Sequence, residues 1–225
     1  MTTLSTRRFL SRAALDAALE ARLRQAIAAS EASAIMLSGG KTPLPAYRAL
    51  SAGPLPHDDR LHVLFSDERY VPSDAEASNY HQSRALLDAL GLPPELLLRV
   101  RTELPLQEAA ADYDRQLATL LSSGLHIGLG LLGLGVDGHT ASLFGPPDLE
   151  RARGYYAIAV QRPDGMSAVS VTPELLTTVG EVLFVVAGRG KQDAVAALIA
   201  QDARLTAWRA VQGCAAVTLW VHEGD

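Results

Sequence analysis

Cysteine and aromatic residues are scarce in this chain. Its 225 residues contain one cysteine, Cys214, and only 5% aromatic side chains. A single thiol cannot form a disulfide within the chain or a cysteine cluster around zinc. A chain of this length buries roughly 70% of the surface that its unfolded form exposes, which suffices for a stable apolar core. The sequence therefore predicts one domain over residues 1–225 that needs no disulfide or structural metal.

The chain also lacks an excess of positive charge and long apolar runs. Its 20 Lys and Arg residues stand against 25 Asp and Glu residues, which gives a formal net charge of -5. Because proteins bind nucleic acids mainly through clustered Lys and Arg, we expect no nucleic-acid partner. Arg12, Asp16 and Glu20 interrupt the first apolar segment, and no run approaches the length of a membrane span. We expect a soluble cytoplasmic protein without a membrane partner, either a monomer or a small homo-oligomer.

What the chain does have is an alternation of helical and strand-like segments. Apolar residues recur at every fourth position in the first of them, and this spacing predicts a helix over 13–29. Short apolar runs predict strands at 32–37, 61–65, 127–135, 155–160, 168–172, 181–188 and 215–221. Further helices are predicted from Thr42 onward, near 79–90, and over 105–122 and 190–201. This order indicates an α/β fold of the doubly wound, Rossmann-like type: a mostly parallel sheet with helices on both faces.

Ligands of such folds bind beyond the carboxyl ends of the strands, so the residues that follow each strand are of interest. Gly39 and Gly40 follow the strand predicted at 32–37 and precede a helix. Glycine permits close backbone approach, and a helix N-terminus attracts anions. An ordinary turn is the alternative. The segment is not a nucleotide-binding P-loop, because that motif requires glycine where the chain has Ile35.

Two further charged positions follow strands. Asp67, Glu68 and Arg69 come directly after the apolar residues at 63–65, where a side chain can face a ligand. A solvated turn with a local ion pair is the alternative. Lys191 lies in the first turn of a predicted helix, where the helix dipole disfavours a cation. A bound phosphate would explain this placement, although a lysine that extends along the surface would also fit.

A glycine-rich segment follows the strand predicted at 127–135. Gly133, Gly135 and Gly138 match the G-x-G-x-x-G dinucleotide fingerprint. Gly145 and the two prolines after it would stop the following helix too early for that motif, however. The next strand also lacks the closing acidic residue, since it runs into Gln161.

We therefore interpret this segment as a strand that turns to present Asp137 and His139 at the start of a short helix. A helix N-terminus disfavours imidazolium, so this interpretation predicts a neutral imidazole, the form that a general base requires. A structural histidine among glycines is the alternative.

Taken together, these segments resemble the 6-phosphogluconolactonase family. The matching stretches are SGGKTP at 38–43, SDERYVPSDAEASNY at 66–80, GLGVDGHTASLF at 133–144 and AGRGK at 187–191. The related glucosamine-6-phosphate deaminases carry DEY and DGHIAFNEP where this chain has DER and DGHTASLF. Both segments therefore favour the lactonase.

The resemblance implies hydrolysis of 6-phospho-D-glucono-1,5-lactone in the pentose phosphate pathway, without a metal or an organic cofactor. His139 would be the general base, and Asp137 would either orient it or cap the helix. Asp67 would accept hydrogen bonds from sugar hydroxyls, whereas Arg69 and Lys191 would pair with the phosphate. The other implied substrate-binding residues are Gly39, Gly40, Lys41 and Thr42.

One position departs from the family pattern. The family usually has an arginine where this chain has Ala168. Arg162 or Lys41 could supply the missing charge, and the sequence does not decide between them. This departure keeps two alternatives open: a deaminase or isomerase of hexosamine phosphates, and a sugar-phosphate sensor without catalysis.

Overall fold

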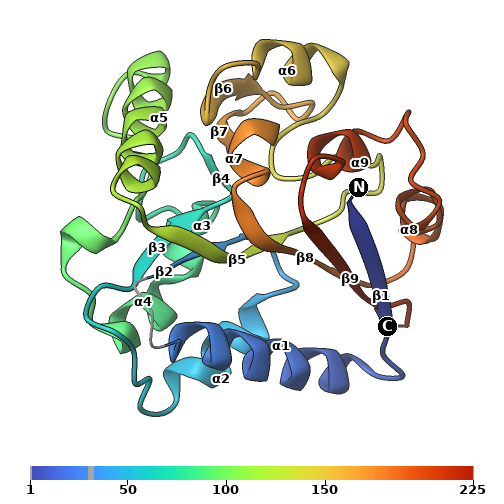
Figure 1. The fold of residues 1–225 in the computed structure, drawn as a ribbon, viewed down its shortest axis with the longest axis horizontal. Helices are drawn as coiled ribbons and strands as arrows, with labels where there is room; N and C mark the ends of the chain where they lie inside the picture. The colour runs from blue at the N-terminus through green and yellow to red at the C-terminus, as the bar shows by residue number, and fades with distance from the viewer. Residues whose placement is uncertain (1, 30–32, 225) are drawn as a thin grey trace.

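The computed structural model describes residues 2–29 and 33–224, so residue 32 of the strand predicted at 32–37 lies outside the described part. Its centre is a six-stranded sheet in which every adjacent pair is parallel (Figure 1). The strand order is β1-β9-β8-β5-β2-β3. The strands are β1 Thr3–Arg8, β2 Ser33–Leu37, β3 His62–Phe65, β5 His126–Leu132, β8 Val179–Ala187 and β9 Ala216–His222.

Helices cover both faces of this sheet, which confirms the predicted α/β architecture (Figure 1). The first face is covered by α1 Arg12–Ile27, α2 Leu44–Ser51 and α4 Arg84–Leu90. The second is covered by α5 Leu106–Ser122, α7 Pro173–Leu176, α8 Gln192–Ile199 and α9 Thr206–Val211. The remaining short elements are α3 Asn79–Gln82, α6 Pro146–Arg151 and a 3-10 turn at Pro94–Leu96.

The apolar strands divide their side chains between two cores, as the alternation of a strand requires. In β2, Ile35 and Leu37 pack with the buried face of α1, whereas Ala34 and Met36 pack with α5. All four are essentially inaccessible to solvent. A strand that is buried on both faces has little place for a charged side chain without a partner. The charged residues of a binding site are therefore expected beyond the ends of these central strands.

The strands predicted at 155–160 and 168–172 do not join the parallel sheet. They form a separate antiparallel sheet, in which β7 Ser167–Val171 lies between β4 Asp67–Arg69 and β6 Ala157–Gln161. A parallel crossover needs a dozen or more residues, and only five separate β6 from β7. A hairpin is the connection that this length allows.

Further differences concern exposed or short elements. The strand β1 was not predicted, because its sequence TLSTRR is polar and its residues are mostly exposed at the edge of the sheet. The predicted helix near 79–90 is divided at Ser83 into α3 and α4.

Within the described ranges, no helix combines the length and the apolar character that a membrane span needs. The assignment of residues 1–225 to one domain stays a prediction.

Candidate functional site

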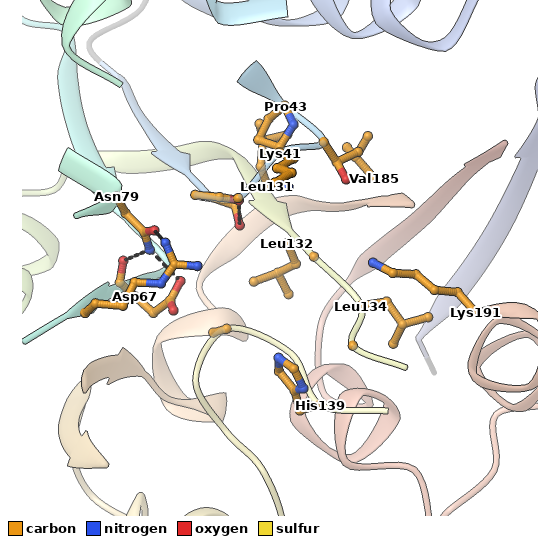
Figure 2. Close-up of a pocket in the computed structure, with 18 of the residues that line it drawn as sticks. Lys41, Pro43, Asp67, Asn79, Leu131, Leu132, Leu134, His139, Val185 and Lys191 are labelled. Carbon is orange, nitrogen blue, oxygen red and sulfur yellow. Dashed lines mark hydrogen bonds between the residues drawn. The ribbon is translucent and has the colours of Figure 1, made fainter. Parts of the chain in front are cut away.

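A cavity of about 250 Å³ opens at the carboxyl ends of β2, β3, β5 and β8. It lies where ligands of parallel α/β sheets bind. Figure 2 shows His139, Lys191 and the pair formed by Asp67 and Asn79 on three sides of it. The cavity brings together eight of the predicted site residues: Gly39, Gly40, Lys41, Thr42, Asp67, Arg69, His139 and Lys191. The ninth, Asp137, lies behind His139 and does not line the cavity.

Asp137 holds the imidazole of His139 at one nitrogen. Its Oδ1 lies 2.5 Å from Nδ1 of His139 and also accepts from the His139 backbone N–H at 3.2 Å. A carboxylate at Nδ1 favours the tautomer with the proton on that nitrogen, which leaves a lone pair on Nε2. The Nε2 atom has no hydrogen-bond partner among the described residues. Partial burial opposes ionisation of Asp137, but the hydrogen bonds from His139 outweigh it and hold the carboxyl pKa below its ordinary value.

The prediction that His139 begins a short helix is wrong. Residues 137–143 form turns and a single bridge between Thr140 and Leu143, and the next helix starts at Pro146. Gly138 and Ala141 have φ values of +81° and +47°, which a right-handed helix cannot contain. The helix dipole therefore has no role at His139. The neighbouring carboxylate orients the imidazole instead, and Asp137 has no helix to cap.

The glycines of this loop allow the close packing around His139. A Cβ atom on Gly135 would lie 2.1 Å from Nδ1 of His139, and one on Gly138 would lie 2.3 Å from a methyl carbon of Leu205. The loop is closed by a hydrogen bond from the Gly135 N–H to the His139 carbonyl. The fingerprint-like glycine spacing thus reflects packing around a histidine. It does not form a dinucleotide site.

A network of buried polar groups forms the second side of the cavity. Asp67 is 6% exposed and accepts from Ser66 Oγ at 2.9 Å, Ser142 Oγ at 2.7 Å and Asn79 Nδ2 at 3.3 Å. The Oδ1 atom of Asn79 accepts from Nη1 of Arg69 at 2.6 Å. These contacts fix Asp67 and Arg69 before any ligand arrives. Asn79 was not among the predicted site residues, because only the folded chain shows that it joins the other two.

Glu68, which lies between these two residues in sequence, has a structural role. Its side chain points away from the cavity, as the alternation in β4 requires, and accepts from the backbone N–H groups of Asn79 and Tyr80 at 2.7 and 2.8 Å. Burial raises the pKa of this carboxyl, although the hydrogen bonds from Tyr80 and Asn79 oppose the shift. Glu68 therefore holds the start of α3, where Asn79 lies.

The glycine loop after β2 packs tightly against this network. A Cβ atom on Gly39 would lie 1.9 Å from Asn79 Oδ1, so only glycine fits there without displacement of Asn79. The Gly40 N–H donates to Gln82 Oε1 at 3.1 Å and is therefore not available to a ligand. Arg12 donates to the Thr42 carbonyl at 2.8 Å. The helix α2 begins at Leu44, two residues later than predicted, because residues 41–43 form a turn.

Two buried tyrosines bind the backbone where two strands end. The hydroxyl of Tyr47 donates to the Ser38 carbonyl at 2.8 Å and accepts from the Ser38 N–H at 3.3 Å. The hydroxyl of Tyr113 does the same at Phe65, at 2.6 and 2.9 Å. Burial raises the pKa of both phenols far above the ordinary value. The loops that carry Gly39 and Asp67 therefore start from fixed points.

The cavity contains both of the lysines in the chain. The 20 basic residues comprise 18 arginines, Lys41 and Lys191. Lys191 was predicted in the first turn of a helix, but it is the N-cap residue of α8, one position before the helix begins. Figure 2 shows its side chain extended into the cavity. Its ammonium has no hydrogen-bond or ion-pair partner in the described part of the chain, and burial lowers its pKa. A half-buried cation without a partner suits an anionic ligand.

Comparisons with known proteins agree with this geometry. A sequence profile described as glucosamine-6-phosphate isomerases/6-phosphogluconolactonase matches residues 8–220. A 6-phosphogluconolactonase of Synechocystis sp. is 38% identical over 194 residues, which are 81% of this chain and 78% of that protein.

Solved structures show the same fold. The crystal structure of a 6-phosphogluconolactonase from Thermotoga maritima superposes with a TM-score of 0.80 at 27% identity, over 98% of this chain and 99% of that one. For a 6-phosphogluconolactonase from Trypanosoma brucei the TM-score is 0.83 at 25% identity, over 97% and 96%.

Proposed function

Because the chain belongs to the family of glucosamine-6-phosphate isomerases and 6-phosphogluconolactonases, we propose that it hydrolyses 6-phospho-D-glucono-1,5-lactone to 6-phospho-D-gluconate. This is a step of the oxidative pentose phosphate pathway. The observation that carries the proposal is the pairing of His139 with Asp137 at the edge of a cavity that also holds Lys191, a half-buried cation with no partner among the described residues. Such a site combines a general base with a binding site for an anionic group.

In the proposed mechanism His139 is the general base. Its Nε2 accepts a proton from a water molecule as the water oxygen attacks the C1 carbonyl of the lactone. The tetrahedral intermediate then collapses, the bond between C1 and the ring oxygen breaks, and the imidazolium returns the proton to that oxygen. Asp137 stabilises the imidazolium between these two steps, because its carboxylate lies at Nδ1. The products are a carboxylic acid and a hydroxyl group, so atoms balance with water alone.

Binding of the distant phosphate positions the reacting carbon. Lys191, Lys41 and Arg69 are the cations that we assign to the phosphate. Asp67 accepts from sugar hydroxyls with the lone pairs that its buried network leaves. A substrate fixed at its phosphate presents C1 to His139 at a defined distance, and this converts binding energy into rate.

The remaining assigned groups belong to the glycine loop. Gly39 and Thr42 line the cavity, and in this proposal the Gly39 amide and the Thr42 hydroxyl donate to substrate oxygens. Gly40 contributes differently from the sequence-based prediction. Its N–H already donates to Gln82, so its part is to let the backbone turn at a φ of +85°.

The test is to generate the lactone in place with glucose-6-phosphate dehydrogenase and to follow its disappearance. The lactone also hydrolyses without an enzyme, so each rate is compared with buffer and with a His139→Ala variant. We expect the wild-type protein to accelerate the loss of lactone at catalytic concentration. A wild-type rate equal to that in buffer would contradict the proposal.

The same preparation distinguishes the two alternative functions. Release of ammonia from glucosamine 6-phosphate would identify a deaminase. Saturable binding of 6-phosphogluconate without any acceleration of lactone loss would identify a sensor. We expect neither result, because the segments at 66–80 and 133–144 match the lactonase pattern and His139 is held in a form that can accept a proton.

A further inference from the structure

The cavity is lined by one more cation, Arg162, which none of the assignments above includes. It follows the last residue of β6 and begins the hairpin that leads to β7. Its N–H donates to the Met166 carbonyl at 2.8 Å, and its own carbonyl accepts from the Gly165 N–H at 3.1 Å. The backbone at Arg162 is therefore fixed by a closed turn.

The guanidinium is held at one end. Nε of Arg162 donates to both carboxylate oxygens of Asp164, at 3.2 and 3.1 Å, and Nη2 donates to Oδ2 at 2.9 Å. Its planar group lies 5.4 Å from the centre of the Phe144 ring. The side chain of Arg162 is only 15% exposed, whereas that of Asp164 is 44% exposed. Asp164 thus orients the guanidinium from the solvent side.

The other end of the guanidinium has spare hydrogen-bonding capacity, and Arg162 lines the cavity. Among the described residues, Nη1 makes one contact, a long one of 3.4 Å to Ser142 Oγ. That hydroxyl donates its own proton to Asp67 at 2.7 Å, so it meets Arg162 only as an acceptor. Nη1 carries two N–H groups, and its single contact is longer than an ordinary N–H···O bond. By contrast, Nη1 of Arg69 is fully used by Asn79 and Ala77.

The neighbouring strand cannot supply this charge. Ala168 lies on β7 directly opposite Arg69 on one side and Val160 on the other, and it is fully buried. Val160 precedes Arg162 by two residues, so Arg162 is the next residue on the same face of β6 as the chain leaves the sheet. The cation that follows β6 therefore lies on the same side of the small sheet as Arg69, where Ala168 supplies no charge, and both arginines line the cavity.

We propose that Arg162 binds the phosphate of the substrate through Nη1, and that it takes the place of a charged residue at position 168. This inference rests on the proposed function for the identity of the anion. Asp164 is a positioning residue in this arrangement, since it fixes the fork of the guanidinium and does not line the cavity. Arg162 accordingly contributes to recognition of the phosphorylated substrate and takes no part in proton transfer.

The test compares ligands with and without the phosphate. Dissociation constants for 6-phosphogluconate, gluconate and inorganic phosphate are measured by calorimetry on the wild type, Arg162→Met and Arg162→Lys. We expect Arg162→Met to weaken 6-phosphogluconate about tenfold and to weaken inorganic phosphate as well, because a charge-assisted hydrogen bond is lost. Gluconate should change less than about twofold, and Arg162→Lys should lie between the wild type and Arg162→Met.

A matched control is Arg60→Met. Arg60 forms the same type of fork with the carboxylate two residues before it, Asp58, but at the opposite edge of the sheet, before β3. The Arg60→Met variant should bind all three ligands as tightly as the wild type does. If Arg162→Met destabilises the hairpin, melting curves will show it, and Arg162→Lys then carries the comparison.

Two results would overturn the assignment. One is unchanged binding of 6-phosphogluconate in both Arg162 variants, and the other is an equal loss of gluconate and 6-phosphogluconate. A wild-type protein that binds 6-phosphogluconate without hydrolysing the lactone would refute the proposed function alone. The role of Arg162 in anion binding would then still be decided by the same titrations.

Discussion

Asp137 and His139 face each other across a two-residue turn, with the carboxylate Oδ1 2.5 Å from Nδ1 of the imidazole. The contact places the free Nε2 on the side of the cavity, which His139 lines and Asp137 does not. His139 is therefore oriented by a residue of its own loop.

Substitution of His139 should remove catalysis and leave binding. We expect His139→Ala to lower kcat by about 10²–10⁴-fold, the usual contribution of a general base, with little change in the Kd for 6-phosphogluconate. The measurement is the coupled lactone assay together with calorimetry. His62→Ala is the control, since His62 lies at the amino end of β3, far along the strand from the cavity. Near-normal turnover in His139→Ala would exclude it as the base.

Asp137→Asn should lower kcat less than His139→Ala does, because the imidazole remains but its cationic form loses a neighbouring negative charge. The variant also has a pH signature. The folded-state pKa of Asp137 is below the unfolded value of about 3.9, so its ionisation stabilises the fold above that pH. This stabilisation is lost as the pH falls through the folded-state pKa. The difference in Tm between wild type and Asp137→Asn should thus shrink as the pH falls below about 4. A difference that does not shrink there would show that the ionised carboxylate of Asp137 does not stabilise the fold.

Lys191→Met should weaken ligand binding without loss of stability. Burial lowers the folded-state pKa of Lys191, so at neutral pH the buried charge opposes folding, and stability rises as the pH rises from that pKa toward the unfolded value of about 10.4. We expect the Tm of Lys191→Met at pH 7 to equal or exceed that of the wild type. We also expect its KM for the phosphorylated lactone to rise about tenfold or more. A lower Tm with an unchanged KM would show that Lys191 is a structural residue.

Removal of the hydroxyl from Tyr47 or Tyr113 should loosen the loops at the strand ends. Each Tyr→Phe change keeps the ring and leaves a backbone N–H and carbonyl of Ser38 or Phe65 unpaired, which costs about 1–3 kcal/mol of stability. We expect kcat/KM to fall along with Tm in both variants. Tyr155→Phe, at an exposed site, is the control and should match the wild type. If a destabilised Tyr113→Phe variant kept full activity, the hydrogen bonds that fix the backbone at Phe65 would not be needed for catalysis.

The sequence predicts the parallel sheet well because the strands that form it are apolar on both faces. A strand of that kind is a continuous run of apolar residues in the sequence, as at 34–37 and 182–186. The edge strand β1 has no such run, because it is polar and mostly exposed. The small antiparallel sheet was misassigned, although the segment RPDG at 162–165, between two apolar runs, is a typical turn. The segment between these two apolar runs is too short for a parallel connection, so the sequence already excluded one.

The resemblance of the motifs to a known family predicted more of the candidate site than general rules about strand ends and helix termini did. Residues after strands could be placed near one another, and eight of them line one cavity. Asn79 was missed because its contacts with Asp67 and Arg69 depend on a loop that returns through α3. Arg162 was considered but could not be placed, since its position depends on the hairpin. The neutral form of His139 was attributed to a helix, which the φ values of Gly138 and Ala141 exclude.

The two lysines give the protein an unusual chemical property. Every other basic side chain is a guanidinium, so apart from the α-amino group the primary amines of this chain are those at the cavity. A reagent that acylates amines therefore attaches to side chains only where the ligand is proposed to bind. Lys191 should react faster than an ordinary lysine, because a lowered pKa increases the fraction of free amine at neutral pH. The extent of labelling, read from the intact mass, would then report occupancy of the cavity without any engineered probe.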